Sequence, residues 1–222
     1  MMSLSPEAYA LARKMMVDSQ LRPNKVMDAR VLDLFGSLPR ERFVPAALTA
    51  RAYTDENIRL GADRVMLAPM VLARMIQDSA IQDGEKILLV GAGTGYGAAV
   101  LAGLDAQVTA LESDASLAAT ARPALAETAA SVKLVQGSLA AGWAAQAPYD
   151  VIFIEGAADF VPEALSAQLA ESGRVVLVSH DRGRIGAVAV GVRSAGALSF
   201  SPKFDCVAPV LPGLAREAAF VF

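Results

Sequence analysis

The chain has 222 residues, of which 54% are hydrophobic, with a formal net charge of −3 and one cysteine, Cys206. This charge balance excludes the broad basic surface typical of nucleic-acid binding, and a single cysteine excludes an internal disulfide. A chain of this length suits one α/β domain with a small extension.

The pattern over the first 80 residues predicts helices. "MMSLSPEAYALARKMMVDSQ" lacks the basic start and apolar core of a signal peptide, so we expect a cytoplasmic protein. Ser5 can cap a helix that begins at Pro6, and apolar residues at helical spacing predict a second helix that ends at Gly36. Loop or irregular structure is expected over "LPRERFVP" and "AYTDENIRLGADRVMLAP", followed by a helix with Pro69 in its first turn.

After Asp83-Gly84, short apolar runs alternate with alanine-rich stretches. Such runs are typical of strands buried on both faces, and the alternation predicts βαβ units in a doubly wound, mostly parallel sheet. Strands are expected at 86–91, 107–112, 132–136, 149–156 and 173–179, and helices at 95–104, 115–129 and 162–171. "AVAVGVRS" and "AAFVF" are candidate edge strands. We expect a helical lid segment, 1–80, packed on a core domain, 81–222, so that the two form a single compact unit.

One run of eighteen residues, "ILLVGAGTGYGAAVLAGL" (87–104), carries no charge. It is nearly as long as a membrane helix of about 20 residues, but its glycines make a helix through the whole run unfavourable. A strand, a turn over Gly91–Gly95 and a helix from Tyr96 fit it better. Glycines let a backbone turn sharply beside a ligand, and the helix N-terminus offers free N–H groups.

The G-x-G-x-G spacing at the strand end resembles the first motif of S-adenosylmethionine-dependent methyltransferases. The candidate cofactor residues in this loop are Gly91, Ala92, Gly93, Gly95 and Tyr96. A dinucleotide loop is a poorer match, because its third glycine position falls on Tyr96. A glycine-rich turn that serves only close helix–strand packing is the alternative.

Glu112 ends the second strand of this region, 21 residues after Gly91. A carboxylate at this place can accept hydrogen bonds from both hydroxyls of a ribose, and Ser113 follows it. A solvated strand-end glutamate is the alternative. Asp114 is expected to cap the next helix. Glu155 ends the fourth strand, either facing the same cleft or merely capping the strand.

Longer matches extend the resemblance to most of the chain. "MVDSQLRPNKVMDARVLDLFGSLPRERFVP", "AYTDENIRLG", "VGAGTGYGAAVLAGL" and "APYDVIFIEGAADFVPEALSAQLAESGRVVLV" are similar to segments of protein-L-isoaspartate (D-aspartate) O-methyltransferases. The resemblance implies a Rossmann-like class I methyltransferase fold with an N-terminal helical extension. It also implies S-adenosylmethionine as cofactor and methyl transfer to the carboxylate of an isoaspartyl residue in a protein or peptide, a repair reaction. If Glu155 faces the cleft, it is a candidate to accept a hydrogen bond from the amino group of the cofactor's methionine moiety.

The sequence departs from the family in the substrate loop. The family's Gln-[Thr/Ser]-x-Ser-Gln-Pro corresponds to "RVMLAP", which places its serine on Leu67. The family's Gly-Asp-Gly, which reads the adenine, falls on Gly137-Ser138-Leu139, so Ser138 and Leu139 are the candidate adenine contacts. Two alternatives stay open: a more apolar methyl acceptor, suited to "VMLAPM", and a scaffold of the same fold without turnover.

Arg64 is the candidate for orienting the substrate, because a guanidinium at the lip of the pocket can grip a carboxylate with two hydrogen bonds. A solvated loop arginine is the alternative. A substrate carboxylate is already deprotonated at pH 7, so we assign no catalytic acid or base. His180 is the sole histidine and lies far from Cys206 in sequence, so no metal site is expected. The sequence does not indicate an oligomeric state.

Overall fold

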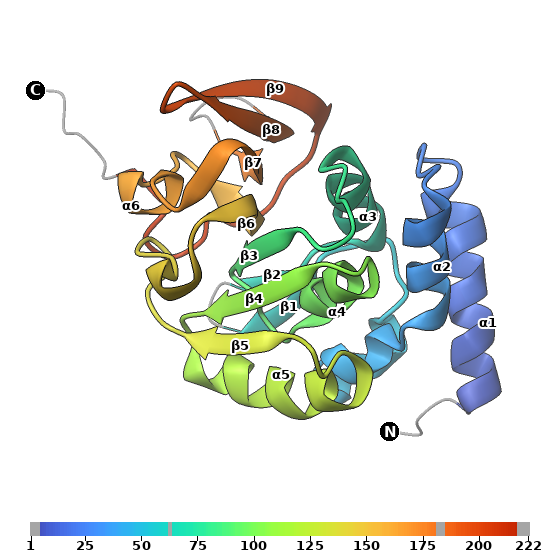
Figure 1. Cartoon of the computed structure of the whole chain (residues 1–222). Helices are drawn as coiled ribbons and strands as arrows, with labels where there is room; N and C mark the ends of the chain where they lie inside the picture. Colours follow the sequence, from blue (N-terminus) through green and yellow to red (C-terminus); the bar gives the residue numbers. More distant parts are fainter. Residues whose placement is uncertain (1–4, 62–63, 181–184, 217–222) are drawn as a thin grey trace, which may run out of the picture.

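The computed structural model describes residues 5–61, 64–180 and 185–216, and its centre is a seven-stranded sheet (Figure 1). The strand order is β5-β4-β3-β6-β7-β8-β9. All pairings from β5 to β7 are parallel, whereas β8 and β9 pair antiparallel at one edge. The doubly wound, mostly parallel sheet is therefore confirmed. Its strands are β3 (Lys86–Val90), β4 (Gln107–Glu112), β5 (Lys133–Gln136), β6 (Tyr149–Ala158), β7 (Leu169–Ser179), β8 (Ala187–Ser194) and β9 (Ala197–Asp205).

Most of the helices cover one face of this sheet. They are α1 (Pro6–Met16), α2 (Ala29–Ser37), α3 (Pro69–Asp78), α4 (Tyr96–Gly103) and α5 (Ala115–Thr128). The short helix α6 (Glu163–Ser166) lies on the other side, as Figure 1 shows. The predicted caps are confirmed: Ser5 Oγ accepts a hydrogen bond from the Ala8 N–H, and Asp114 Oδ1 accepts from the Ser116 and Leu117 N–H groups.

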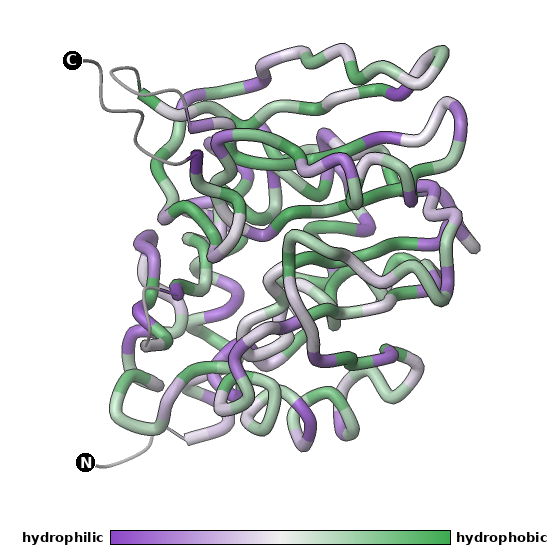
Figure 2. Tube along the Cα trace, turned by 90° about the vertical axis from the view of Figure 1, so that its left-hand side faces the viewer, coloured by the Kyte–Doolittle hydropathy of each residue, from purple (hydrophilic) through white to green (hydrophobic). Residues whose placement is uncertain are grey.

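Two hydrophobic clusters lie on the two faces of the sheet. Successive side chains of a strand point to opposite faces, so Ile87 and Leu89 of β3 join the helix side while Leu88 and Val90 join the other. The strands accordingly form the apolar middle of the molecule in Figure 2. Phe35 from α2 belongs to the same cluster as Ile87 and Val176, so the N-terminal helices share the core of the sheet.

Tertiary pairing overrides the sequence pattern at three places. The helix predicted at 162–171 is wrong beyond Ser166, because Gln168 and Leu169 are already paired with Tyr149 of β6. The segment expected to be irregular before Pro69 contains a hairpin of β1 (Ile58–Gly61) and β2 (Arg64–Met66). Strand β9 was not predicted, because its polar sequence with Pro202 is typical of an exposed edge. The "AAFVF" segment lies outside the described residues.

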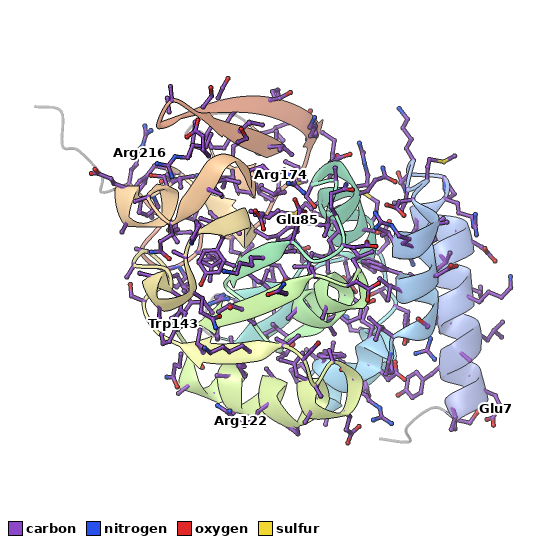
Figure 3. The ribbon with its side chains drawn as sticks, in the orientation of Figure 1. Glu7, Glu85, Arg122, Trp143, Arg174 and Arg216 are labelled. Atoms are coloured by element: carbon purple, nitrogen blue, oxygen red, sulfur yellow. The ribbon has the colours of Figure 1, made fainter. Side chains whose placement is uncertain are left out.

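The uncharged run 87–104 forms β3, the glycine turn and α4, as predicted. Within the described ranges, none of the helices combines the length and the apolar character that a membrane crossing needs. At the end of the sheet away from the glycine turn, Arg174 of β7 donates to both carboxylate oxygens of Glu85, over 2.8 and 2.6 Å (Figure 3). This ion pair ties β7 to the turn that precedes β3.

Candidate functional site

The candidate site lies where the direction of winding reverses. The chain runs from β3 outward through β4 to β5, and then returns to place β6 on the other side of β3. In open α/β sheets, ligands bind at the carboxyl ends of the strands at this switch point. The turn after β3, Glu112 at the end of β4 and Glu155 in β6 meet there.

The turn after β3 needs glycine at three positions. The φ angles of Gly91, Gly93 and Gly95 are +82°, +56° and +97°, in the left-handed region that side chains disfavour. Gly91 and Ala92 donate their N–H groups to the carbonyl of Leu111, which fixes the turn against β4. Gly95 then leads directly into α4. The predicted strand–turn–helix is confirmed.

Glu112 is completely buried and receives hydrogen bonds from several directions. Its Oε2 accepts from the Gly93 N–H at 2.7 Å, and its Oε1 accepts from the Ser113 and Asp114 N–H groups at 2.8 and 2.9 Å. Arg64 Nη1 and Nη2 donate to Oε1 and Oε2, each over 2.8 Å. The alternative of a solvated glutamate is wrong, since Glu112 is 0% exposed.

Arg64 differs from both expectations. It lies on β2, not in a loop, and only 4% of it is exposed, so it is not solvated. Its guanidinium grips a carboxylate with two hydrogen bonds, as its chemistry suggested, but that carboxylate is the protein's own Glu112. In this structure Arg64 therefore pairs with Glu112, the residue expected to bind a ribose. Its guanidinium is not free to bind a substrate.

Glu155 lies beneath the first turn of α4. A Cβ placed on Gly97 would come within 2.1 Å of Glu155 Oε2, so only glycine at position 97 leaves room for this carboxyl group. Glu155 Oε2 is buried without a hydrogen-bond partner, and burial raises the pKa of Glu155 to about 8. At neutral pH this acid is therefore mostly protonated.

Arg40 is a buried residue of the site region that the sequence analysis missed. Its Nε and Nη2 donate to the carbonyls of Ala52 and Leu67, each over 2.7 Å, and its Cζ lies 4.8 Å from the centre of the Tyr96 ring. Its positive charge lowers the pKa of Glu155 against the larger effect of burial. "LPRERFVP" gave no signal for this, because charged residues in a predicted loop are ordinarily solvated.

Several candidate side chains do not face the glycine turn. The Tyr96 ring packs edge-on against Phe35 and Phe43, and burial raises the pKa of Tyr96 to about 12. Leu139 belongs to the hydrophobic cluster on the other face of the sheet, whereas Ser138 is exposed. Tyr96 and Leu139 can thus offer mainly backbone atoms to a ligand.

The substrate loop also differs from its expected character. Met66 and Leu67 are 2% and 0% exposed, in the core between the sheet and the helices. The side chains of "VMLAPM" that suggested an apolar acceptor are therefore used for packing.

Elsewhere on the strand-end side, His180 Nδ1 lies 2.7 Å from Asp159 Oδ1. Burial raises the pKa of the Cys206 thiol to about 11.

Two spaces adjoin the β1–β2 hairpin. The outer groove has a volume of about 840 Å³ and is lined by Asn57, Arg59, Gly61, Arg64, Val65 and Val207–Val210. The inner hollow, between the hairpin and the glycine turn, encloses only about 190 Å³, and none of it is wide enough for a water molecule. Ligand pockets ordinarily measure about 300–1,000 Å³, so of these two spaces the outer groove has such a size and the inner hollow does not.

The chain's own side chains cover the glycine turn. A Cβ placed on Gly93 would lie 3.1 Å from Leu60 Cδ1, and one on Gly91 would lie 2.6 Å from Leu211 Cδ1 and 3.1 Å from Arg64 Nη2. The backbone frame of a nucleoside site is therefore present, while Leu60, Arg64 and Leu211 occupy the space in front of it.

Comparison with known proteins agrees with the geometry. A family model described as protein-L-isoaspartate(D-aspartate) O-methyltransferase matches residues 12–198. A protein-L-isoaspartate O-methyltransferase of Methylorubrum populi is 44% identical over 166 residues, which cover 75% of this chain and 78% of the relative. One from Koribacter versatilis is 38% identical over 208 residues, which cover 92% and 93%.

Solved structures agree on the fold. A protein-L-isoaspartate O-methyltransferase superposes with a TM-score of 0.80 at 24% identity, over 90% of this chain and 66% of that one. A second, from Plasmodium falciparum and in complex with S-adenosyl-L-homocysteine, gives a TM-score of 0.77 at 16% identity, over 90% and 97%.

Proposed function

Because the chain belongs to the protein-L-isoaspartate(D-aspartate) O-methyltransferase family, we propose that it methylates the carboxylate of isoaspartyl residues with S-adenosylmethionine. The observation that carries this proposal is the position of Glu112. Its carboxylate is fixed beside the left-handed glycine turn, at the switch point of the sheet. A nucleoside bound in front of the turn would present its ribose to this group.

The backbone frame fits this cofactor. The turn from Gly91 to Gly95 would hold it, and Glu112 would accept hydrogen bonds from its ribose hydroxyls. Glu155 would receive its amino group, and Ser138 would lie on the adenine side. The backbone has the required shape, but the Glu112 carboxylate is occupied. Arg64 must release Glu112 before a ribose can pair with that carboxylate.

The outer groove is where an isoaspartyl peptide would bind. Arg64 forms part of its wall, so a guanidinium released from Glu112 could pair there with an acidic group. Asn57 shapes it: its Oδ1 accepts from the Ala68 N–H at 2.8 Å, and its Nδ2 donates to the Val207 carbonyl at 3.2 Å. These bonds hold the hairpin, the start of α3 and the C-terminal segment together.

The proposed methyl transfer does not need a catalytic acid or base. S-adenosylmethionine supplies a sulfonium methyl group when bound, and a carboxylate at pH 7 is already the nucleophile. The protein's part is to align the two and to exclude water, which can account for roughly 7–11 kcal/mol of a barrier. The absence of the family's serine at Leu67 therefore removes a positioning group rather than a proton acceptor.

The test is methyl transfer from radiolabelled S-adenosylmethionine to a peptide with one isoaspartyl residue. The same peptide with aspartate is the substrate control. We expect base-labile methyl ester on the isoaspartyl peptide only. Equal labelling of both peptides, or no labelling by correctly folded protein, would overturn the proposal.

A pair of glycine variants tests the site. Gly93 and Gly84 both have a positive φ, but only a methyl group on Gly93 would project toward the hairpin, whereas nothing lies within 4 Å of one on Gly84. We expect Gly93→Ala to lower kcat/KM by ~10- to 100-fold, because small misplacements are costly in a positioning site. Gly84→Ala is expected to stay within about 2-fold, since its strain is similar and its place is remote.

A further inference from the structure

The ion pair between Arg64 and Glu112 uses up the carboxylate. An ionised carboxylate offers about four lone-pair directions, and Glu112 already receives two hydrogen bonds from Arg64 and three from backbone N–H groups. Nothing remains for the hydroxyls of a ribose. The backbone donors are fixed by the glycine turn and the strand end, so Arg64 is the partner that can leave.

Arg64 stands between the two spaces. Its side chain lines the outer groove, while its Nη2 would lie 3.1 Å from a Cβ on Gly91, against the glycine turn. Because Leu60 of β1 covers Gly93 from the same hairpin, one movement of the hairpin would take Leu60 away from Gly93 and Arg64 away from Gly91, while Leu211 of the C-terminal segment would still lie against Gly91. The inner hollow would then join the outer groove.

A buried guanidinium does not leave its partner without a replacement, because breaking such a pair strands an uncompensated charge. The replacement has to be an anionic group in the outer groove, where Arg64 already forms part of the wall. The substrate of the proposed function carries such a group, a carboxylate, which matches a guanidinium with two hydrogen bonds.

We propose that Arg64 is an internal competitor for the cofactor's ribose, which releases Glu112 when a carboxylate in the outer groove takes over its guanidinium. Acidic substrate and cofactor therefore bind with positive coupling. This inference rests on the proposed function for the identity of the two ligands. The closed contact, by which we mean the Arg64–Glu112 ion pair, is a property of the free chain.

The first measurement is calorimetric binding of S-adenosylhomocysteine to the wild type, Arg64→Met and Arg59→Met. We expect Arg64→Met to bind at least ~10-fold more tightly than the wild type, because the population of open site no longer limits affinity. Arg59→Met, on the same hairpin but exposed, is expected to match the wild type. Saturating isoaspartyl peptide should tighten binding to the wild type and leave Arg64→Met unchanged. Equal affinity of the wild type and Arg64→Met without peptide would overturn the inference.

The second measurement needs no cofactor. Amide hydrogen exchange of the β1–β2 hairpin is expected to be ~10-fold faster in Arg64→Met than in the wild type or Arg59→Met, because the ion pair holds the hairpin closed. Arg64→Lys keeps the charge without the double hydrogen bond and should be intermediate. Equal exchange in all four proteins would refute the closed contact. Should no protein bind S-adenosylhomocysteine while exchange still differs, the proposed function fails and the closed contact stands.

Discussion

Two buried carboxyl groups beside the glycine turn, Glu112 of β4 and Glu155 within β6, have opposite environments. Glu112 receives six hydrogen bonds: two from Arg64, three from backbone N–H groups and one from the Ser113 hydroxyl. Glu155 has an oxygen without a partner under α4, and burial raises its pKa to about 8. The two carboxyl groups thus have different hydrogen-bonding surroundings, although both lie beside the same glycine turn.

Glu155→Gln is expected to remove a pH-dependent loss of stability. A carboxyl group whose pKa is raised by folding binds more protons in the folded state, so stability falls as the pH rises from 4.5 toward 8. At ~1.4 kcal/mol per pKa unit, this difference corresponds to up to ~5 kcal/mol. The variant should therefore gain stability over the wild type at pH 8 compared with pH 5, measured by urea unfolding. Glu163→Gln, exposed on α6, is the control; an equal pH effect in wild type and Glu155→Gln would contradict the prediction.

Single residues also mark how far a sequence can predict the site. Glycine spacing and the 21-residue interval to Glu112 follow from chain geometry, so both could be placed from the sequence. The partner of Glu112 could not, because Arg64 precedes it by 48 residues and meets it only after the hairpin packs on the turn. The burial of Arg40 depends likewise on carbonyls of other segments, those of Ala52 and Leu67.

Among the elements, the β1–β2 hairpin depends most on contacts with other segments for its position. An isolated two-stranded hairpin is marginally stable in water. Its place depends on its contacts with the rest of the chain: Arg64 with Glu112, and the neighbouring Asn57 with Ala68 and Val207. This explains how a short element can cover the glycine turn and still be the part of the site suited to move.

The packing of the segment that precedes α3 is expected to depend on Arg40. Arg40→Met leaves the carbonyls of Ala52 and Leu67 buried without donors, which should cost about 2–4 kcal/mol of unfolding free energy in denaturant titrations. The matched control is Arg42→Met, whose exposed pair with Glu127 is worth ~0.5 kcal/mol or less. If the two variants lose the same stability, the anchoring role of Arg40 is wrong.

Element types were predictable where one strong pattern dominated. Uniform apolar runs identified β3, β4 and β6, because strands buried on both faces need no polar alternation. The predicted helix around 162–171 failed because helix propensity is weak beside the pairing of Leu169 with β6. An edge strand such as β9 is mostly exposed, so its sequence carries little hydrophobic signal.

At the scale of the whole molecule, one hydrophobic cluster includes residues from both sides of the expected boundary at residue 80. Met16, Leu21 and Phe35 belong to one cluster with residues of β3, β6 and β7. Gly103 of α4 is close enough to α2 that a Cβ would lie 2.3 Å from Leu34 Cδ2. We therefore propose that segments 1–80 and 81–222 unfold as one cooperative unit.

Phe35→Ala tests this cooperativity with a distant reporter. Phe35 is 0% exposed on α2 and contacts Tyr96 edge-on, so its truncation should cost about 3–5 kcal/mol. The sole tryptophan, Trp143, lies across the sheet from α1 and α2 (Figure 3) and packs against the other hydrophobic cluster. If one unit unfolds, the urea midpoints from Trp143 fluorescence and from circular dichroism will fall together and by the same amount. Leu11→Ala, 59% exposed on α1, should leave both midpoints in place. If Phe35→Ala leaves the midpoint of the Trp143 transition unchanged, the two segments fold separately, because Trp143 senses α2 only through the shared core.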